Sequence, residues 1–137
     1  MRLRPVCWFR ALFGAHSTLG ATLPAGSAFQ SLALEIVLTL FLVFTILNVA
    51  TGAKEKGLTA GLAIGGVVGL AALFAGPISG ASMNPARSLA PALVSGQLQH
   101  LWVYLLAPVI GAAIAVVACR CSRGPECCLS RATAYER

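Results

Sequence analysis

Three long apolar stretches, separated by short polar ones, dominate the sequence. Residues 28–50, 58–76 and 100–119 each approach the length of ~20 mostly apolar residues that a transmembrane helix needs. The third stretch opens with Trp102 and Tyr104, whose amphipathic rings suit a membrane–water interface. The pattern therefore predicts three membrane-spanning helices.

A polar segment, "GPISGASMNPARSLAP", follows the second apolar stretch and is too short and too polar to span a membrane. Asn84 is a favourable N-cap, and Pro85 a favourable first helical residue, because its missing N–H would be unpaired there anyway. We expect a short helix from Pro85 to roughly Val94, preceded by irregular backbone. Irregular backbone at membrane depth is tolerated only inside protein or along a water-filled cavity. The segment at about 77–95 is therefore predicted to enter the membrane, return to the same side and line a polar passage.

The short helix would direct the free N–H groups and positive dipole of its first turn toward the membrane midplane. Asn84 would present a carboxamide donor there, with Arg87 about one turn away. Such a site repels cations and accepts small neutral or anionic groups. The alternative is an amphipathic surface helix with Arg87 at the lipid headgroups, which leaves the irregular backbone unexplained.

Composition supports a membrane protein, because 58% of the residues are hydrophobic and 10% are charged, against about 25% charged in a soluble domain. The length of 137 residues allows one domain at most. The chain has no aspartate, and its few histidines and glutamates form no acid–base or nucleophile set, so we expect no enzyme. The bases gather at the termini and in one loop instead of forming a stripe, so no nucleic-acid partner is expected.

Basic residues also bear on orientation. One side of a three-span chain would hold Arg2, Arg4, Arg10 and Arg87. The other side would hold Lys54, Lys56, Arg120, Arg123, Arg131 and Arg137. By the positive-inside rule, the small excess places the Lys54–Lys56 loop and the C-terminus in the cytoplasm.

Small residues recur at four-residue spacing in two of the predicted spans. Gly61, Gly65 and Gly69 lie in the second, and Gly111 and Ala115 in the third. Such spacing lets another backbone approach closely, which favours a tight bundle. The alternative is glycine used without a packing role.

Five cysteines are present, one of them Cys7 and the others Cys119, Cys121, Cys127 and Cys128 near the C-terminus. An odd count in an intracellular tail indicates free thiols. Their spacing fits no standard zinc pattern, which leaves the four C-terminal cysteines as candidate ligands for a soft metal or metalloid. No cofactor is expected.

The segment "SGASMNPARS" resembles the second Asn-Pro-Ala box of the aquaporin (major intrinsic protein) family, and the resemblance extends over roughly residues 10–119. "LFAGPISGASMNPARSLAPALVSG" is most similar to nodulin-26-like and related bacterial channels. The resemblance implies an all-α membrane fold with one aquaporin-type repeat. That repeat has three transmembrane helices and a re-entrant half-helix with the Asn-Pro-Ala box, equivalent to helices four to six of a six-helix channel.

The resemblance also implies roles for individual residues. The pore motif would be Asn84, Pro85 and Ala86. The selectivity filter would include Arg87, Ala72 and Ala81. A ladder of carbonyl oxygens would come from Gly80, Ala81, Ser82 and Met83. Glu35, inside the first span, would hold the re-entrant loop by hydrogen bonds.

Ala72 stands where water-selective members usually have a histidine, which implies a wider and less polar constriction. The function expected by resemblance is passive passage of water and small uncharged solutes, of the glycerol, urea or metalloid-hydroxide type. Two alternatives remain: a non-conducting truncated fragment of such a channel, and a small membrane protein with a thiol-rich, metalloid-binding tail.

The family has two inverted repeats, whereas this sequence contains one Asn-Pro-Ala box. We therefore expect the C-terminal half of a channel, left by a truncated gene, a frameshift or a late start codon. Residues 1–26 would be an N-terminal stub and extracellular loop, 27–120 the half-channel and 121–137 a cytoplasmic tail. Closing a pore would need an N-terminal repeat or a second copy, and the resemblance implies a homotetramer in the plasma or inner membrane.

Overall fold

The structure, a computed structural model, describes residues 14, 20–51 and 58–123. These residues form helices joined by short connections, without a strand among them. The helices are α2 (Ala28–Thr51), α3 (Leu58–Ser79), α4 (Pro85–Ser95) and α5 (Leu101–Arg123). The predicted N-terminal stub, the Lys54–Lys56 loop and most of the predicted C-terminal tail lie largely or wholly outside the described residues.

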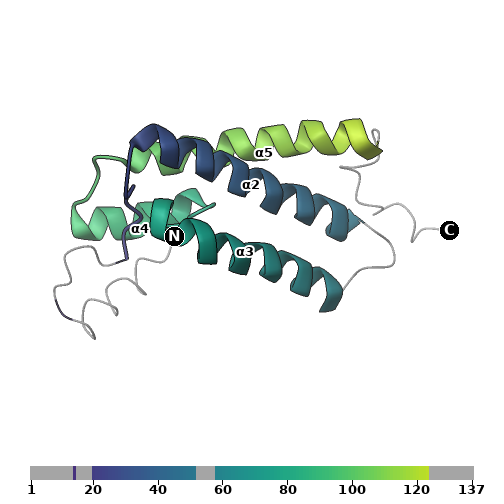
Figure 1. Cartoon of the computed structure of the whole chain (residues 1–137), viewed down its shortest axis with the longest axis horizontal. Coiled ribbons are helices and arrows are strands. Elements are labelled where there is room, and N and C mark those ends of the chain that lie inside the picture. The colour runs from purple at the N-terminus through teal and green to yellow at the C-terminus, as the bar shows by residue number, and fades with distance from the viewer. Residues whose placement is uncertain (1–13, 15–19, 52–57, 124–137) are drawn as a thin grey trace.

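Helix α2 lies between α5 and α3, and packs more extensively against α5 (Figure 1). After α3 the chain turns back beside the bundle, and the short α4 leads it to the end where α5 begins, packing against α5 on the way (Figure 1). Helices α2, α3 and α5 are long enough and apolar enough to cross a membrane. The all-α fold with three spans and one short helix is confirmed.

The helices run slightly further than the sequence pattern indicated. Helix α3 continues to Ser79 and passes through Pro77, where the missing N–H removes one hydrogen bond from its last turn. Helix α4 ends at Ser95, followed by Gly96 with φ of 74°, the left-handed conformation common just after a helix. Irregular backbone therefore begins at residue 80, and the half-helix at Pro85.

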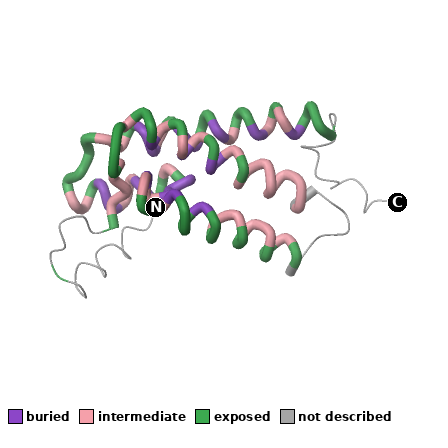
Figure 2. Tube along the Cα trace, viewed as in Figure 1, coloured by how far each residue is buried: buried purple, intermediate pink, exposed green. Residues whose placement is uncertain are grey.

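A close contact between α2 and α5 forms the centre of the bundle. A Cβ atom placed on Gly111 would lie 2.5 Å from the carbonyl oxygen of Ile36 and 2.9 Å from Cβ of Thr39. Gly111 thus makes the close backbone approach that the small-residue pattern predicted. The buried residues of α5 recur every three or four positions along the same side (Figure 2): Val103, Tyr104, Ala107, Pro108, Gly111, Ala115 and Cys119.

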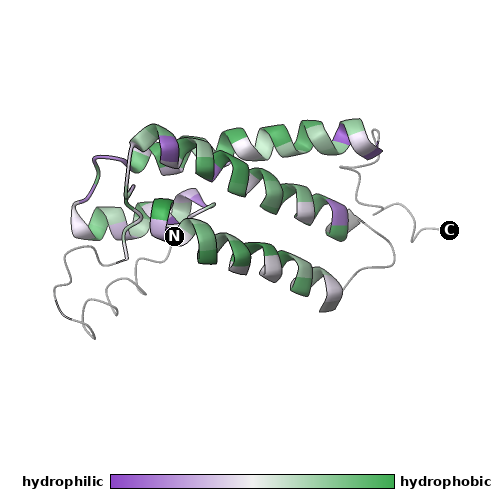
Figure 3. Ribbon diagram, in the orientation of Figure 1, coloured by the Kyte–Doolittle hydropathy of each residue, from purple (hydrophilic) through white to green (hydrophobic). Residues whose placement is uncertain are grey.

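The glycine stripe of α3 behaves differently. A Cβ atom placed on Gly61, Gly65 or Gly69 meets nothing within 4 Å, so these residues make no close approach within the described part of the chain. Leu62 and Leu73 are 76% and 78% exposed, and α3 is apolar along most of its length (Figure 3). A helix that is apolar all round is either buried or membrane-spanning, so hydrocarbon or another apolar surface must cover this one.

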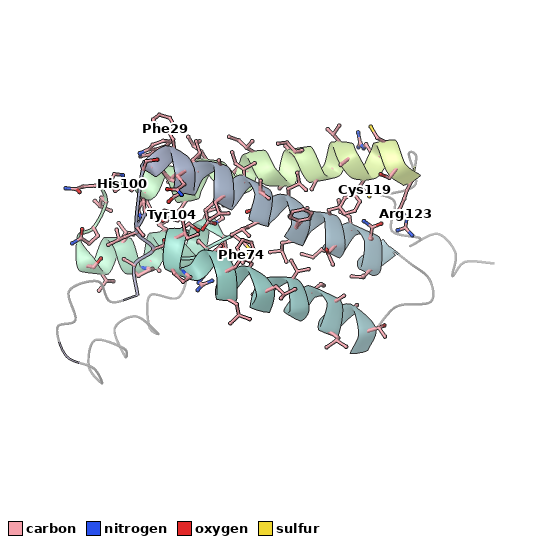
Figure 4. The ribbon with its side chains drawn as sticks, in the orientation of Figure 1. Phe29, Phe74, His100, Tyr104, Cys119 and Arg123 are labelled. Atoms are coloured by element: carbon pink, nitrogen blue, oxygen red, sulfur yellow. The ribbon has the colours of Figure 1, made fainter. Side chains whose placement is uncertain are left out.

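Contacts at both ends fix α2 beside α5. At one end the rings of Phe29 and Trp102 meet edge to face, with centroids 6.3 Å apart. At the other end the Arg123 guanidinium donates a hydrogen bond to the carbonyl oxygen of Asn48 at 3.2 Å. Phe29 and Arg123 mark these opposite ends (Figure 4).

Candidate functional site: the re-entrant loop and half-helix

Residues 80–84, between α3 and α4, adopt an uncommon backbone conformation. Gly80 has φ of 85°, and Ala81 and Met83 have φ of 43° and 50°. Positive φ is uncommon for residues other than glycine, and it persists only where the surroundings enforce it. The contacts of this loop therefore decide whether its shape can be maintained.

Glu35 of α2 provides the first set of contacts. Its Oε1 accepts hydrogen bonds from the Ser82 amide at 2.9 Å and the Ser79 hydroxyl at 2.8 Å. Its Oε2 accepts a bond from the Met83 amide at 2.8 Å. The side chain is fully buried, where a carboxyl group is costly unless donors surround it. Two consecutive loop amides are thereby held by one side chain of the neighbouring helix.

Tyr104 of α5 provides a second contact. Its hydroxyl donates a hydrogen bond to the carbonyl oxygen of Ser79 at 2.7 Å. Tyr104 is fully buried, at the end of α5 that lies near α4 (Figure 4). Tyr104 is therefore enclosed by protein and its hydroxyl is used by the loop, whereas Trp102 is exposed. The interfacial location expected for both rings stays a prediction.

The loop leaves several polar backbone atoms open. The carbonyl oxygen of Ala81 accepts a hydrogen bond from Nη1 of Arg87 at 2.9 Å. Within the described part of the chain, the carbonyl oxygens of Gly80, Ser82 and Met83 receive no hydrogen bond. Backbone carbonyls are normally paired with protein or water, so these three still need a hydrogen-bond donor from outside the described residues.

Asn84 begins the half-helix as its N-cap. It has φ of −151° and ψ of 117°, and its Oδ1 accepts a hydrogen bond from the Ala86 amide at 2.9 Å. Pro85 occupies the first helical position. The Nδ2 donors of Asn84 have no partner in the described ranges, and the side chain is exposed. Because Oδ1 is committed to the cap, Asn84 presents only donors to its surroundings.

The three residues assigned to the filter are placed differently. Arg87 is exposed and contacts the loop through Ala81, which is itself buried. Ala72 is an exposed residue of α3, about two helical turns before the end of that helix. The structure thus joins Arg87 to Ala81 directly, and their roles in selection stay a prediction.

The described site combines unpaired acceptors, a donor side chain and an arginine on one short segment between two candidate membrane spans. In comparisons with known proteins, the model of the family "Major intrinsic protein" matches residues 7–118. The chain belongs to the major intrinsic protein family. The resemblance carried by "SGASMNPARS" is therefore confirmed.

Relatives within the family are similar to this chain over three quarters of its length. Aquaporin NIP1-4 of Oryza sativa subsp. japonica is 53% identical over 105 residues, covering 76% of this chain and 38% of the relative. Nodulin-26 of Glycine max is 48% identical over 104 residues, covering 75% and 38%. Aquaporin NIP1-2 of Arabidopsis thaliana is 48% identical over 99 residues, covering 72% and 34%. The chain spans less than two fifths of the length of these relatives.

Three hydroxyl groups of this family member also reach the half-helix, and sequence reasoning did not identify them. Thr22 bonds to Ser88 at 2.6 Å, Ser88 to Ser82 at 2.6 Å, and Ser82 to the carbonyl oxygen of Asn84 at 2.9 Å. The available signal was Ser88 itself, since a hydroxyl one turn into a helix of the apolar region needs a partner. That signal does not tell which residue the partner is.

The cysteines do not assemble a site within the described residues. Cys119 is buried and disulfide-bonded, which differs from the free thiol expected there. Cys121 is free and exposed, while Cys127 and Cys128 lie outside the described ranges. No group of three metal-ligating side chains occurs among the described residues.

Proposed function

We propose that this chain supplies one side of a passive channel for water and small uncharged solutes. The observation that carries the proposal is that unpaired donors and unpaired acceptors occur on one segment. The donors are on Asn84 Nδ2, and the acceptors are the carbonyl oxygens of Gly80, Ser82 and Met83. A hydroxyl group donates one hydrogen bond and accepts others, so water or a polyol finds both kinds of partner along this segment. Permeation then replaces bonds to bulk water with bonds to the pore wall.

Charge at the site would exclude cations. Arg87 lies in the first turn of α4, where the helix dipole is also positive. Its Nη1 is bonded to Ala81, which holds the guanidinium against the loop. A fixed positive charge beside a narrow polar passage raises the energy of a passing cation and leaves neutral solutes unaffected.

The small side chains of Ala72 and Ala81 support a constriction wide enough for solutes larger than water. We assign the solute class as glycerol, urea and hydroxylated metalloids, all of which are neutral and rich in hydrogen-bonding groups. Alanine at both positions adds no hydrogen-bonding group of its own, so Arg87 and the carbonyl oxygens would provide the polar contacts.

A complete passage needs a further wall. Asn84 and Arg87 are exposed, and so are several apolar side chains of α3, among them Leu62, Leu73 and Phe74. Polar groups facing hydrocarbon are costly, so another polypeptide surface should cover this side. We propose a complementary repeat, from the same polypeptide or a separate one, or a second copy in the opposite orientation. We also propose, from the family resemblance, a homotetramer in the plasma or inner membrane. The end of α5 would lie in the cytoplasm.

The proposal is tested by stopped-flow light scattering on proteoliposomes. The chain is reconstituted alone and together with the amino-terminal half of Aquaporin NIP1-4. We expect water and glycerol flux above that of empty liposomes in at least the combined sample. Arg87→Ala should change the ratio of glycerol to water flux, whereas the exposed control Ser122→Ala on α5 should not. Flux equal to that of empty liposomes in both samples would favour a non-conducting fragment.

A further inference from the structure

The segment that precedes α2 lies directly on the re-entrant loop. The Ala25 amide donates a hydrogen bond to the carbonyl oxygen of Ile78 at 2.9 Å, at the end of α3. A Cβ atom placed on Gly80 would come within 2.9 Å of Cγ2 of Thr22. Thr22 is therefore seated against the backbone where the loop begins.

The hydroxyl of Thr22 starts a chain of hydrogen bonds with a defined direction. It donates to Oγ of Ser88 at 2.6 Å, and Ser82 donates to the carbonyl oxygen of Asn84 at 2.9 Å. Each hydroxyl has a single hydrogen, and a carbonyl oxygen can only accept. The Ser82 hydroxyl already donates its hydrogen to Asn84, so Ser88 must be the donor in the 2.6 Å hydrogen bond between the two serines. The donors therefore run from Thr22 through Ser88 and Ser82 to Asn84.

This series of hydrogen bonds ends at the carbonyl group of Asn84, which has only a long backbone hydrogen bond otherwise. The backbone bond from the Ser88 amide to the same Asn84 oxygen is long, at 3.4 Å, so the Ser82 hydroxyl is the closer donor. Ser82 and Ser88 are 2% and 1% exposed. In such surroundings hydrogen bonds polarise one another, and a missing partner is costly. A continuous series of hydrogen bonds thus connects the Asn84 carbonyl group to a hydroxyl 62 residues earlier.

We propose that Thr22 is a positioning residue of the half-helix, which acts through Ser88 and Ser82 to fix the orientation of Asn84. Its two γ substituents have separate tasks: the methyl group packs against Gly80, and the hydroxyl begins the chain. The consequence for permeation rests on the proposed function, because it assumes that Asn84 lines the pore. The positioning of the half-helix does not, and it can be measured without any flux.

The test is hydrogen–deuterium exchange of the full chain in lipid nanodiscs, read at the amides of residues 80–88. Thr22→Val keeps the branched shape but removes the hydroxyl, and Thr22→Ser keeps the hydroxyl but removes the methyl group. We expect Thr22→Val to speed exchange about fivefold, the effect of losing one hydrogen bond. Thr22→Ser should exchange at the wild-type rate. Ser95→Ala removes a hydroxyl that bonds to Pro91 on the same half-helix, and should leave residues 80–88 unchanged.

Two results would overturn the proposal. One is wild-type exchange in Thr22→Val, and the other is faster exchange in Thr22→Ser matching that of Thr22→Val, which would assign the effect to the methyl contact. The double variant Thr22→Val/Ser88→Ala tests whether Thr22 acts through the hydrogen bond to Ser88. Residues in one network are non-additive, so the double variant should exchange no faster than Ser88→Ala alone. Failure of the flux experiment would leave all these readings intact.

Discussion

The amide of Met83 lies 2.8 Å from Oε2 of Glu35, a residue 48 positions earlier on a different helix. The neighbouring Ser82 amide bonds to Oε1 of the same carboxyl group at 2.9 Å. Met83 has a positive φ, and two consecutive amides must point the same way for both bonds to form. The positive-φ backbone of the loop is therefore maintained by Glu35 of α2. Removing an oxygen of this carboxyl group should destabilise the loop.

Glu35→Gln replaces one of the two acceptor oxygens with an NH₂ group. One loop amide would then face a donor, and a buried donor without a partner costs about 1–3 kcal/mol. We expect the free energy of unfolding to fall by about 2 kcal/mol, measured by chemical denaturation in detergent micelles. Gln30→Glu is the matched control, an amide–carboxyl exchange at an exposed position of the same helix. Equal midpoints for Glu35→Gln and wild type would contradict the assigned role of Glu35.

Local sequence signals predicted the helices and the start of the half-helix at Pro85, because hydropathy and capping act over a few residues. The bonds of Tyr104 and Thr22 were not predicted, since they join positions 25 and 66 residues apart. A sequence indicates that a buried hydroxyl needs a partner, but the partner depends on how the helices pack. The same limit applies to the glycines, whose spacing indicates a narrow face without telling which helix approaches it.

Gly111→Ala tests the contact between α2 and α5. The added methyl group would overlap the Ile36 carbonyl oxygen at 2.5 Å and approach the Leu40 amide nitrogen at 3.1 Å. Backbone atoms cannot move aside cheaply, so the free energy of unfolding should fall by about 1–3 kcal/mol. Gly66→Ala on α3 meets nothing within 4 Å and should raise it by about 0.5–1 kcal/mol through helix propensity. Denaturant midpoints that shift in the same direction would argue against the close approach.

Gly80→Ala tests the seat of Thr22 on the loop, and Gly96→Ala serves as its control. Both glycines have left-handed φ, of 85° and 74°, so each alanine should cost about 1–2 kcal/mol of backbone strain. Only at Gly80 does the new Cβ also meet Cγ2 of Thr22, at 2.9 Å, whereas nothing lies within 4 Å at Gly96. We expect Gly80→Ala to lower the unfolding midpoint more. Combining it with Thr22→Ser, which removes Cγ2, should recover part of the difference, and no recovery would place the strain elsewhere.

Cys121 offers a test of orientation, because it is free and exposed on the last turn of α5. A membrane-impermeant maleimide should label the protein more strongly than Cys121→Ser, and this Cys121-dependent label should appear only after cells are permeabilised. The other cysteines are kept, because Cys119 is disulfide-bonded. This outcome follows from the basic residues at the end of α5, which favour the cytoplasm. Equal labelling of intact and permeabilised cells would reverse the assigned topology.

Ala72→His tests the width of the proposed constriction. A histidine adds bulk and a hydrogen-bonding ring on the exposed side of α3, so it should narrow the passage for solutes larger than water. We expect glycerol flux to fall about tenfold, the size of effect that steric fit in a tight site produces. Water flux, measured in the same co-reconstituted liposomes, should stay within about twofold of the starting protein, since water still finds a polar surface there. The same substitution at the exposed Ala113 of α5 should change neither flux. A parallel loss of water and glycerol flux in Ala72→His would show that residue 72 affects assembly of the pore and not its selectivity.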